Sequence, residues 1–201
     1  MLKKKKHTIL VDLDDTLNEF APTFWDTYNK KYEENQNYLK VNSWNLQEFA
    51  RPDVDAYSLL KTPGFFRYLP LKEYAEQFME NIYEKYNVYL VTDAPAGTSH
   101  CDIEAGKGYA NPADDKRKWV AEHFPYFPQD QIIICSHKWL IEGDILVDDK
   151  PATFEKFEEL GKRCILIDMP YNRHIETEWR AKDLREAEEM IEEILLAKTV
   201  T

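Results

Sequence analysis

The chain has 201 residues, a formal net charge of −11 at pH 7 and 43% hydrophobic residues. This length is enough to bury a core without disulfide bonds, and 13% aromatic residues exclude a disordered chain. Affinity for a nucleic-acid duplex comes mainly from Lys and Arg side chains that contact phosphates. Because acidic residues outnumber basic ones here, we expect no binding to long nucleic acid. No apolar run approaches the roughly 20 residues of a membrane span, so no membrane partner is expected. Three widely spaced cysteines favour a reducing, cytoplasmic location.

Five short apolar runs rich in Val and Ile predict the strands of a parallel sheet. They lack alternation of apolar and polar residues, which is typical of strands buried on both faces. The runs are Thr8–Leu13, Asn87–Thr92, Gln131–Cys135, Ile145–Val147 and Cys164–Ile167. Helical patterns lie between or after them, at Leu71–Tyr86, Asp114–Phe124, Pro151–Leu160 and Glu176–Lys198. This alternation predicts an α/β fold with a doubly wound parallel sheet.

The segment that follows the first strand has no strand-like run and is rich in aromatic residues. Phe24, Tyr28 and Tyr32 recur every four residues, as on one face of a helix. We interpret residues 17–69 as a small helical cap inserted after the first strand. The core domain then consists of residues 1–16 and 70–201.

Acidic side chains follow the first strand. Asp12 and Asp14 are separated by a single apolar residue, and carboxylates this close repel unless a cation or a proton intervenes. Mg²⁺ prefers oxygen ligands and is the expected partner. The alternative is an acidic turn in which an Asp caps a helix.

Other polar residues stand at comparable places, and ligands of parallel sheets bind at the carboxyl ends of strands. Thr92 ends the second strand and offers a hydroxyl to a phosphate oxygen. Lys116 and Lys118 lie at the front of a predicted helix, where the dipole favours acids. Contact of one of them with a bound phosphate would explain this, and the alternative is a solvated run of charges. Asp148 and Asp149 end the fourth strand and again favour a cation, or cap a helix. The run Ser136–Lys138 also follows a strand, but we interpret it as a surface turn.

The order of these motifs along the chain resembles the haloacid dehalogenase-like superfamily of phosphotransferases. The resemblance covers roughly residues 8–151, and the helical insert is similar to the first type of cap in that superfamily. The residues that carry the resemblance are Asp12, Asp14, Thr92, Lys116, Asp148 and Asp149.

This resemblance implies a mechanism. Asp12 would be the nucleophile that forms an aspartyl-phosphate, and Asp14 would be the general acid and base. Mg²⁺ would be held by the Asp12 carboxylate, the Asp14 backbone carbonyl and Asp149, with Asp148 in support. A second acid at position 14 is typical of phosphatases rather than dehalogenases in this superfamily.

A closer resemblance is to the 5′(3′)-deoxyribonucleotidase branch, of cytosolic type C. It is carried by the segments Val11–Phe20, Thr62–Phe66, Leu69–Leu71, Thr92–Pro95, Asp115–Val120 and Leu146–Pro151. It implies removal of phosphate from nucleoside monophosphates, with a preference for deoxyribose and pyrimidines. The aromatic residues implied to contact the base are Phe20, Trp44, Phe65 and Phe66. The alternative for each is packing inside the cap.

The chain departs from the animal enzymes of this branch at two places. Asp15 and Thr16 stand where those enzymes usually have Gly and Val. Asp93 follows Thr92 where they have a Ser that contacts phosphate or sugar. We group Asp93 with the phosphate-binding residues Thr92 and Lys116, although an acid there suits a sugar or a water better than a phosphate.

Other functions stay open at this point. The same chemistry would serve a sugar phosphate or the end phosphate of a nucleic acid. A non-catalytic module that binds a phosphate ligand is a different class, and the intact acid set argues against it. A flavodoxin-like response receiver would need no helical insert and fewer residues. A homodimer is a further expectation that the sequence leaves open.

Overall fold

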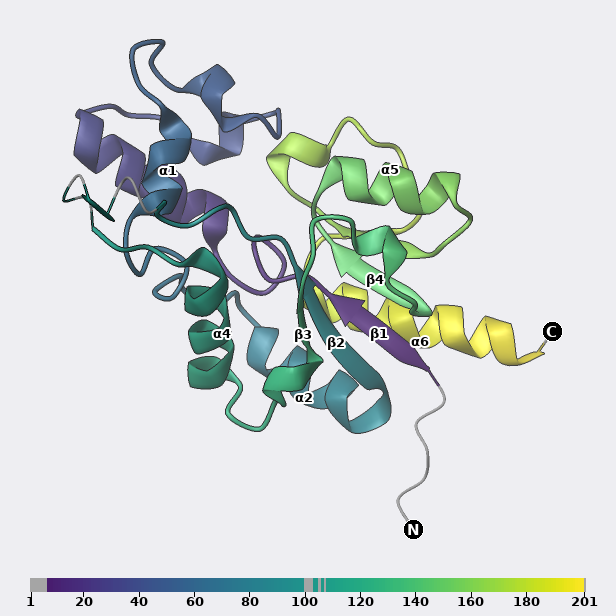
Figure 1. Cartoon of the computed structure of the whole chain (residues 1–201). Coiled ribbons are helices and arrows are strands. Elements are labelled where there is room, and N and C mark those ends of the chain that lie inside the picture. Colours follow the sequence, from purple (N-terminus) through teal and green to yellow (C-terminus); the bar gives the residue numbers. More distant parts are fainter. Residues whose placement is uncertain (1–6, 100–102, 105, 107, 201) are drawn as a thin grey trace.

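A six-stranded parallel sheet forms the centre of the protein, in the order β3-β2-β1-β4-β5-β6 (Figure 1). The computed structural model describes residues 7–99, 103, 104, 106 and 108–200. The strands are β1 (Thr8–Val11), β2 (Asn87–Thr92), β3 (Ile132–Ile134), β4 (Ile145–Asp148), β5 (Cys164–Ile167) and β6 (Arg180–Ala181). The predicted α/β fold with a doubly wound parallel sheet is confirmed.

The first strand in the sequence lies between two strands from different parts of the chain. Ile9 pairs with Val88 of β2 on one side and with Ile145 of β4 on the other. The chain builds outward through β2 and β3, and then returns to the opposite side of β1. Strand order therefore reverses between β1 and β4, which is where open α/β sheets bind their ligands.

Each face of the sheet packs against its own helices. Ile9 and Val11 belong to a buried cluster shared with α2, α4 and α6, whereas Leu10 belongs to a second cluster shared with α5. Figure 1 shows α5 on one side of the sheet and α6 on the other. The helices are α1 (Phe20–Tyr32), α2 (Ala75–Lys85), α4 (Pro112–His123), α5 (Pro151–Glu159) and α6 (Leu184–Val200). Burial on both faces explains why the strands show no alternation.

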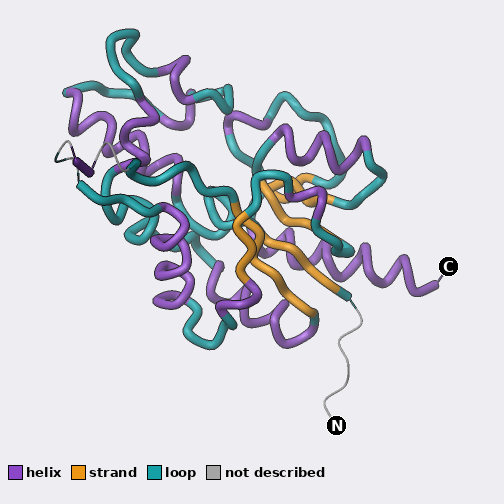
Figure 2. The backbone as a smooth tube through the Cα atoms, viewed as in Figure 1, coloured by secondary structure: helices purple, strands orange, loops and turns teal. Residues whose placement is uncertain are grey.

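The segment between β1 and α2 is helical, as predicted, and lies beyond one end of the sheet (Figure 2). Phe24 and Tyr28 of α1 are fully buried, and Tyr32 packs against the same cluster. Three short 3-10 helices follow, at Tyr38–Lys40, Leu46–Phe49 and Ala56–Lys61. The division into a cap of residues 17–69 and a core of residues 1–16 and 70–201 stays a prediction.

The helix predicted over residues 176–198 begins too early. The two-residue strand β6 occupies part of that range, and α6 starts only at Leu184. The side chain of Asp183 sets this start, because its Oδ1 accepts the backbone N–H groups of Arg185 and Glu186 at 2.9 and 3.0 Å. None of the described helices is long and apolar enough to span a membrane.

Candidate active site

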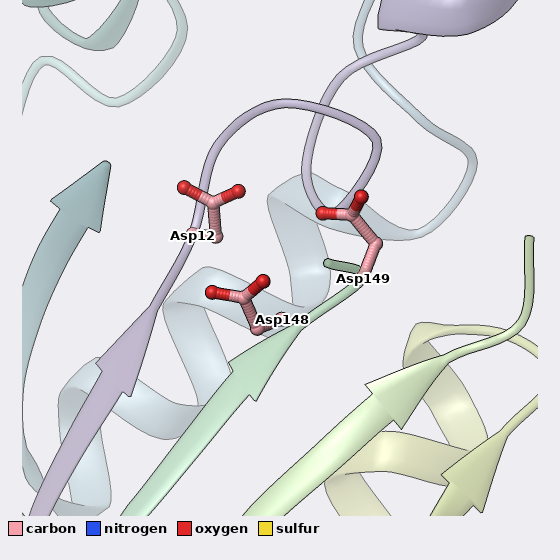
Figure 3. Close-up of side chains that lie close together, drawn as sticks. All are labelled: Asp12, Asp148 and Asp149. Carbon is pink, nitrogen blue, oxygen red and sulfur yellow. The ribbon is translucent and has the colours of Figure 1, made fainter. Parts of the chain in front are cut away.

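Three buried carboxylates meet where the strand order reverses. Asp12 directly follows β1, Asp148 ends β4, and Asp149 is the next residue (Figure 3). One oxygen from each carboxylate lies within 4.8 Å of the other two. The Asp12 N–H donates to the carbonyl of Val147 at 3.0 Å, which ties the two strand ends together. The sheet topology therefore builds an oxygen-rich cluster from two distant parts of the sequence.

The basic partner of this cluster is Lys138. Its side chain is buried, and its Nζ lies 2.8 Å from Asp12 Oδ1 and 2.5 Å from Asp148 Oδ2. Burial alone would lower the pKa of Lys138, but the two carboxylates raise it above its ordinary value, so the ammonium stays charged. The interpretation of Ser136–Lys138 as a surface turn is wrong for Lys138. The signal that pointed to its role was its place after β3, at the same edge of the sheet as the acids.

The charges of the cluster fit a bound cation. Among the described residues Asp149 has no ion pair with Lys or Arg, and burial raises the pKa of its carboxyl well above the ordinary value. The charges of Asp148 and Asp12 raise that pKa further. Burial also raises the pKa of Asp148 to about 6, although Lys138 opposes this. Three buried carboxylates with a single lysine among them keep an excess of negative charge, and carboxylate oxygens are the ligands of a hard divalent metal ion.

A second lysine connects the other predicted site residues. Lys116 Nζ lies 2.6 Å from Asp14 Oδ2 and donates to Thr92 Oγ1 at 2.9 Å and to the backbone carbonyl of Asp93. Lys116 is buried in the second turn of α4 rather than the first, because the helix begins at Pro112. Burial raises the pKa of Asp14, and the Lys116 ammonium opposes this. The structure thus brings the predicted residues of the first three motifs together.

The side chain of Asp93 is engaged by groups on two other segments. Its Oδ1 accepts the hydroxyl of Ser136 at 2.7 Å, and its Oδ2 lies 3.9 Å from Lys150 Nζ. Burial works to raise the pKa of Asp93, but the Ser136 hydrogen bond and the Lys150 charge outweigh it, and the net shift is downward. Asp93 is therefore an ionised side chain at the edge of the site, and its contact with a phosphate stays a prediction.

Comparison with known proteins identifies the family. Residues 6–200 match the family described as "5' nucleotidase, deoxy (Pyrimidine), cytosolic type C protein". The chain belongs to this deoxyribonucleotidase family. The 5'(3')-deoxyribonucleotidase of Clostridium acetobutylicum is 30% identical over 191 residues, which are 94% of this chain and 97% of that one. That of Bacillus subtilis is 28% identical over 172 residues, 84% of this chain and 89% of that one.

Solved structures share the fold of this member of the deoxyribonucleotidase family. A haloacid dehalogenase-like hydrolase from Burkholderia xenovorans superposes with a TM-score of 0.56 at 14% identity, over 96% of this chain and 99% of that one. One from Xanthomonas campestris gives a TM-score of 0.52 at 12% identity, over 96% and 94%. These likenesses confirm the predicted haloacid dehalogenase-like fold. The family description also names a cytosolic protein, which is the location expected from the sequence.

The four aromatic residues expected to contact the base occupy two environments. Phe20 and Trp44 line a cavity of about 100 Å³ that is also lined by Trp25, Tyr38, Tyr57 and Leu60. Phe65 and Phe66 are buried and do not line it. Phe20 stacks on Phe66 at 6.0 Å between ring centres and meets Phe65 edge-on at 5.9 Å. Contact of these residues with a base stays a prediction, and the cavity places Phe20 and Trp44 in the better position for it.

Two further residues of the cavity wall reach the acid cluster, and sequence reasoning assigned neither of them. The hydroxyl of Tyr171 lies 2.5 Å from Asp149 Oδ2 and 2.9 Å from Asp15 Oδ2. Asp15 Oδ1 accepts the N–H of Ala21 at 2.8 Å, which helps to fix the first turn of α1. Burial raises the pKa of Asp15 to about 7. Tyr171 follows β5 after a short loop, so its place near a strand end was the available signal.

Proposed function

We propose that this protein is a metal-dependent phosphomonoesterase that releases phosphate from deoxynucleoside monophosphates through an aspartyl-phosphate. The observation that carries the proposal is the buried cluster of Asp12, Asp148 and Asp149 with Lys138, next to a cavity with aromatic walls. The substrate class is supported by the family description and by the names of the relatives from Clostridium acetobutylicum and Bacillus subtilis.

Asp12 is the proposed nucleophile. Its carboxylate oxygen attacks phosphorus, the bond from phosphorus to the ester oxygen breaks, and the nucleoside leaves as an alcohol. Asp14 gives the leaving oxygen its proton and later removes a proton from the water that hydrolyses the aspartyl-phosphate. Burial raises the pKa of Asp14, which helps this carboxyl hold the proton that it donates. Inorganic phosphate is then released, and the free Asp12 carboxylate is regenerated.

Mg²⁺ is the proposed cation. The Asp12 carboxylate, the Asp14 backbone carbonyl and Asp149 would hold it, with Asp148 in support. When bound, Mg²⁺ offsets the negative charge of the phosphoryl group.

The two buried lysines have different roles in this proposal. An ammonium group has three N–H donors. Those of Lys116 meet Asp14, Thr92 and the Asp93 carbonyl, so Lys116 orients the acid and the threonine. Lys138 contacts two carboxylates, which leaves a donor for a phosphoryl oxygen. We therefore assign the direct charge contact with the phosphoryl group to Lys138, with the Thr92 hydroxyl beside it, whereas the family resemblance favoured Lys116.

The nucleoside is proposed to occupy the cavity, where its base would contact Phe20 and Trp44. Aromatic walls suit a flat ring because stacking adds to the burial of apolar area. Trp44 is 42% exposed and packs edge-on against Tyr171 at 5.1 Å, so a bound base would bury more of its indole. Partners other than the substrate, a homodimer included, stay predictions.

The decisive experiment measures phosphate release from deoxy- and ribonucleoside 5′- and 3′-monophosphates, sugar phosphates and a 3′-phosphorylated oligonucleotide, with and without Mg²⁺. We expect Mg²⁺-dependent release with a preference for deoxynucleoside monophosphates. Activity confined to sugar phosphates or oligonucleotide ends would keep the mechanism and refute the substrate. No release from any compound by folded protein would favour the non-catalytic phosphate-binding module.

A further inference from the structure

We propose that Tyr171 is a positioning residue that orients the Asp149 carboxylate for the divalent cation from within the cavity wall. The inference rests on the proposed function, because it concerns the same site. It assigns a role to an uncharged side chain whose hydroxyl faces two buried carboxylates.

The contacts of Asp149 show what fixes its carboxylate. Oδ2 accepts the Tyr171 hydroxyl at 2.5 Å, and Oδ1 accepts the Thr16 hydroxyl at 3.2 Å. Each oxygen thus has its own donor, and two donors on different oxygens set the rotation of the carboxylate plane. The Tyr171 contact is the shorter of the two.

The hydroxyl also faces Asp15, but the distances favour Asp149. A phenol has one proton, and Tyr171 Oη is 2.9 Å from Asp15 Oδ2 against 2.5 Å from Asp149 Oδ2. Packing alone would be served by Phe at this position. A hydroxyl placed between two buried acids has a polar function, because a buried carboxylate without donors is costly.

The neighbouring residue holds the backbone of Asp149 as well. Asn172 Nδ2 donates to the Asp149 carbonyl at 2.8 Å and to the Ile167 carbonyl at 2.7 Å. Arg180 of β6 donates to Asn172 Oδ1 at 2.7 Å. The 3-10 turn Pro170–Asn172 therefore forms hydrogen bonds to both the main chain and the side chain of Asp149. The Tyr171 ring packs edge-on against Trp44.

A neutral donor suits this position better than a cation would. Lys138 offsets one of the two negative charges of Asp12 and Asp148, whereas Tyr171 orients Asp149 and leaves its negative charge for the metal ion. Hydrogen-bond partners of metal ligands commonly change metal affinity by about 10- to 100-fold when they are removed. We expect an effect of that size here.

The test is Mg²⁺ binding to the full-length, substrate-free protein by isothermal titration calorimetry. Tyr171→Phe removes only the hydroxyl, and we expect Mg²⁺ to bind about 10- to 100-fold more weakly. Raising Mg²⁺ should restore the kcat of this variant. Tyr38→Phe is the matched control, because Tyr38 also lines the cavity and no described hydrogen bond joins it to Asp149. Unchanged Mg²⁺ affinity in Tyr171→Phe would overturn the proposal.

A second pair of variants serves if Tyr171→Phe does not fold. Asp15→Asn removes one of the two buried charges that the hydroxyl faces, and adding Tyr171→Phe to it isolates the hydroxyl again. We expect the double variant to bind Mg²⁺ more weakly than Asp15→Asn alone, and equal affinity would overturn the proposal. Phosphate release is measured separately. A protein that binds Mg²⁺ yet hydrolyses no nucleotide refutes the proposed function, whereas an active protein with Mg²⁺ affinity insensitive to Tyr171 refutes only this inference.

Discussion

Replacing Lys138 by Met tests how much the buried ammonium contributes to the stability of the metal-free protein. The ammonium lies 2.8 Å from Asp12 and 2.5 Å from Asp148, and all three side chains are buried. Removing one partner of a buried ion pair costs about 3–5 kcal/mol, because the other charge is left uncompensated. Two carboxylates lose their partner here, so we expect the metal-free Lys138→Met variant to lose stability within that range at pH 8.

The loss should depend on pH in a defined direction. Burial raises the folded-state pKa of Asp148 to about 6, above its unfolded value, and Lys138 is the largest influence that lowers it. Without Lys138 this pKa rises further. A carboxyl with a raised folded pKa loses stability as pH rises through the interval between its unfolded and folded values. The penalty of Lys138→Met should therefore grow as the pH rises above about 6, and it should be smallest below pH 6, where Asp148 is protonated in both proteins.

The assay is urea unfolding in EDTA at pH 8 and pH 5, followed by circular dichroism. Lys118→Met is the matched control, since Lys118 pairs with Asp114 at 2.7 Å but both side chains are about half exposed. Such surface pairs contribute at most about 1 kcal/mol. If Lys138→Met were no less stable at pH 8 than Lys118→Met, the buried ion-pair reasoning would be refuted.

Other predictions address the chemistry and the cavity. Asp12→Asn should abolish turnover with an unchanged circular dichroism spectrum, and retained activity would exclude Asp12 as the nucleophile. EDTA should remove phosphate release and Mg²⁺ should restore it, whereas metal-independent turnover would contradict the cation site. Trp44→Ala should raise KM for deoxynucleotides more than for p-nitrophenyl phosphate, and equal effects would indicate packing alone. Phe65→Ala should cost about 3–5 kcal/mol in urea unfolding, because the ring is buried in the aromatic cluster; a smaller loss would mean that the cluster repacks.

The acids of the site were predictable because strand ends are a local signal. An apolar run that stops at an acid places that acid at the carboxyl edge of a parallel sheet, and Asp12, Asp148 and Asp149 all follow this rule. The alternation of strands and helices predicted the fold, and the order of the four motifs indicated the superfamily. Thr92 and Lys116 were also placed beside Asp14, although Lys116 is a buried helix residue rather than one at a helix start.

The residues that escaped prediction depend on tertiary contacts. Lys138 lies in a polar run that looks like a surface turn, and only its contacts with Asp12 and Asp148 bury it. Tyr171 donates to Asp149, 22 residues earlier in the sequence, and no local pattern predicts this contact. The strand β6 has two residues, too few for any periodic pattern, and it exists because β5 offers an edge to pair with.

The central position of β1 also affects how the protein is made. The first strand to leave the ribosome pairs with β2 on one side, but its other side finds a partner only when Leu146 and Val147 have been synthesised. Until then the nascent chain carries an open, apolar strand edge that is prone to wrong pairing. The acid cluster needs the same late segment, because a fragment that stops before β4 lacks Asp148 and Asp149. Pairing of β1 with β4 joins distant parts of the sequence, and such non-local contacts form slowly. We therefore expect the nascent chain to depend on chaperones during synthesis.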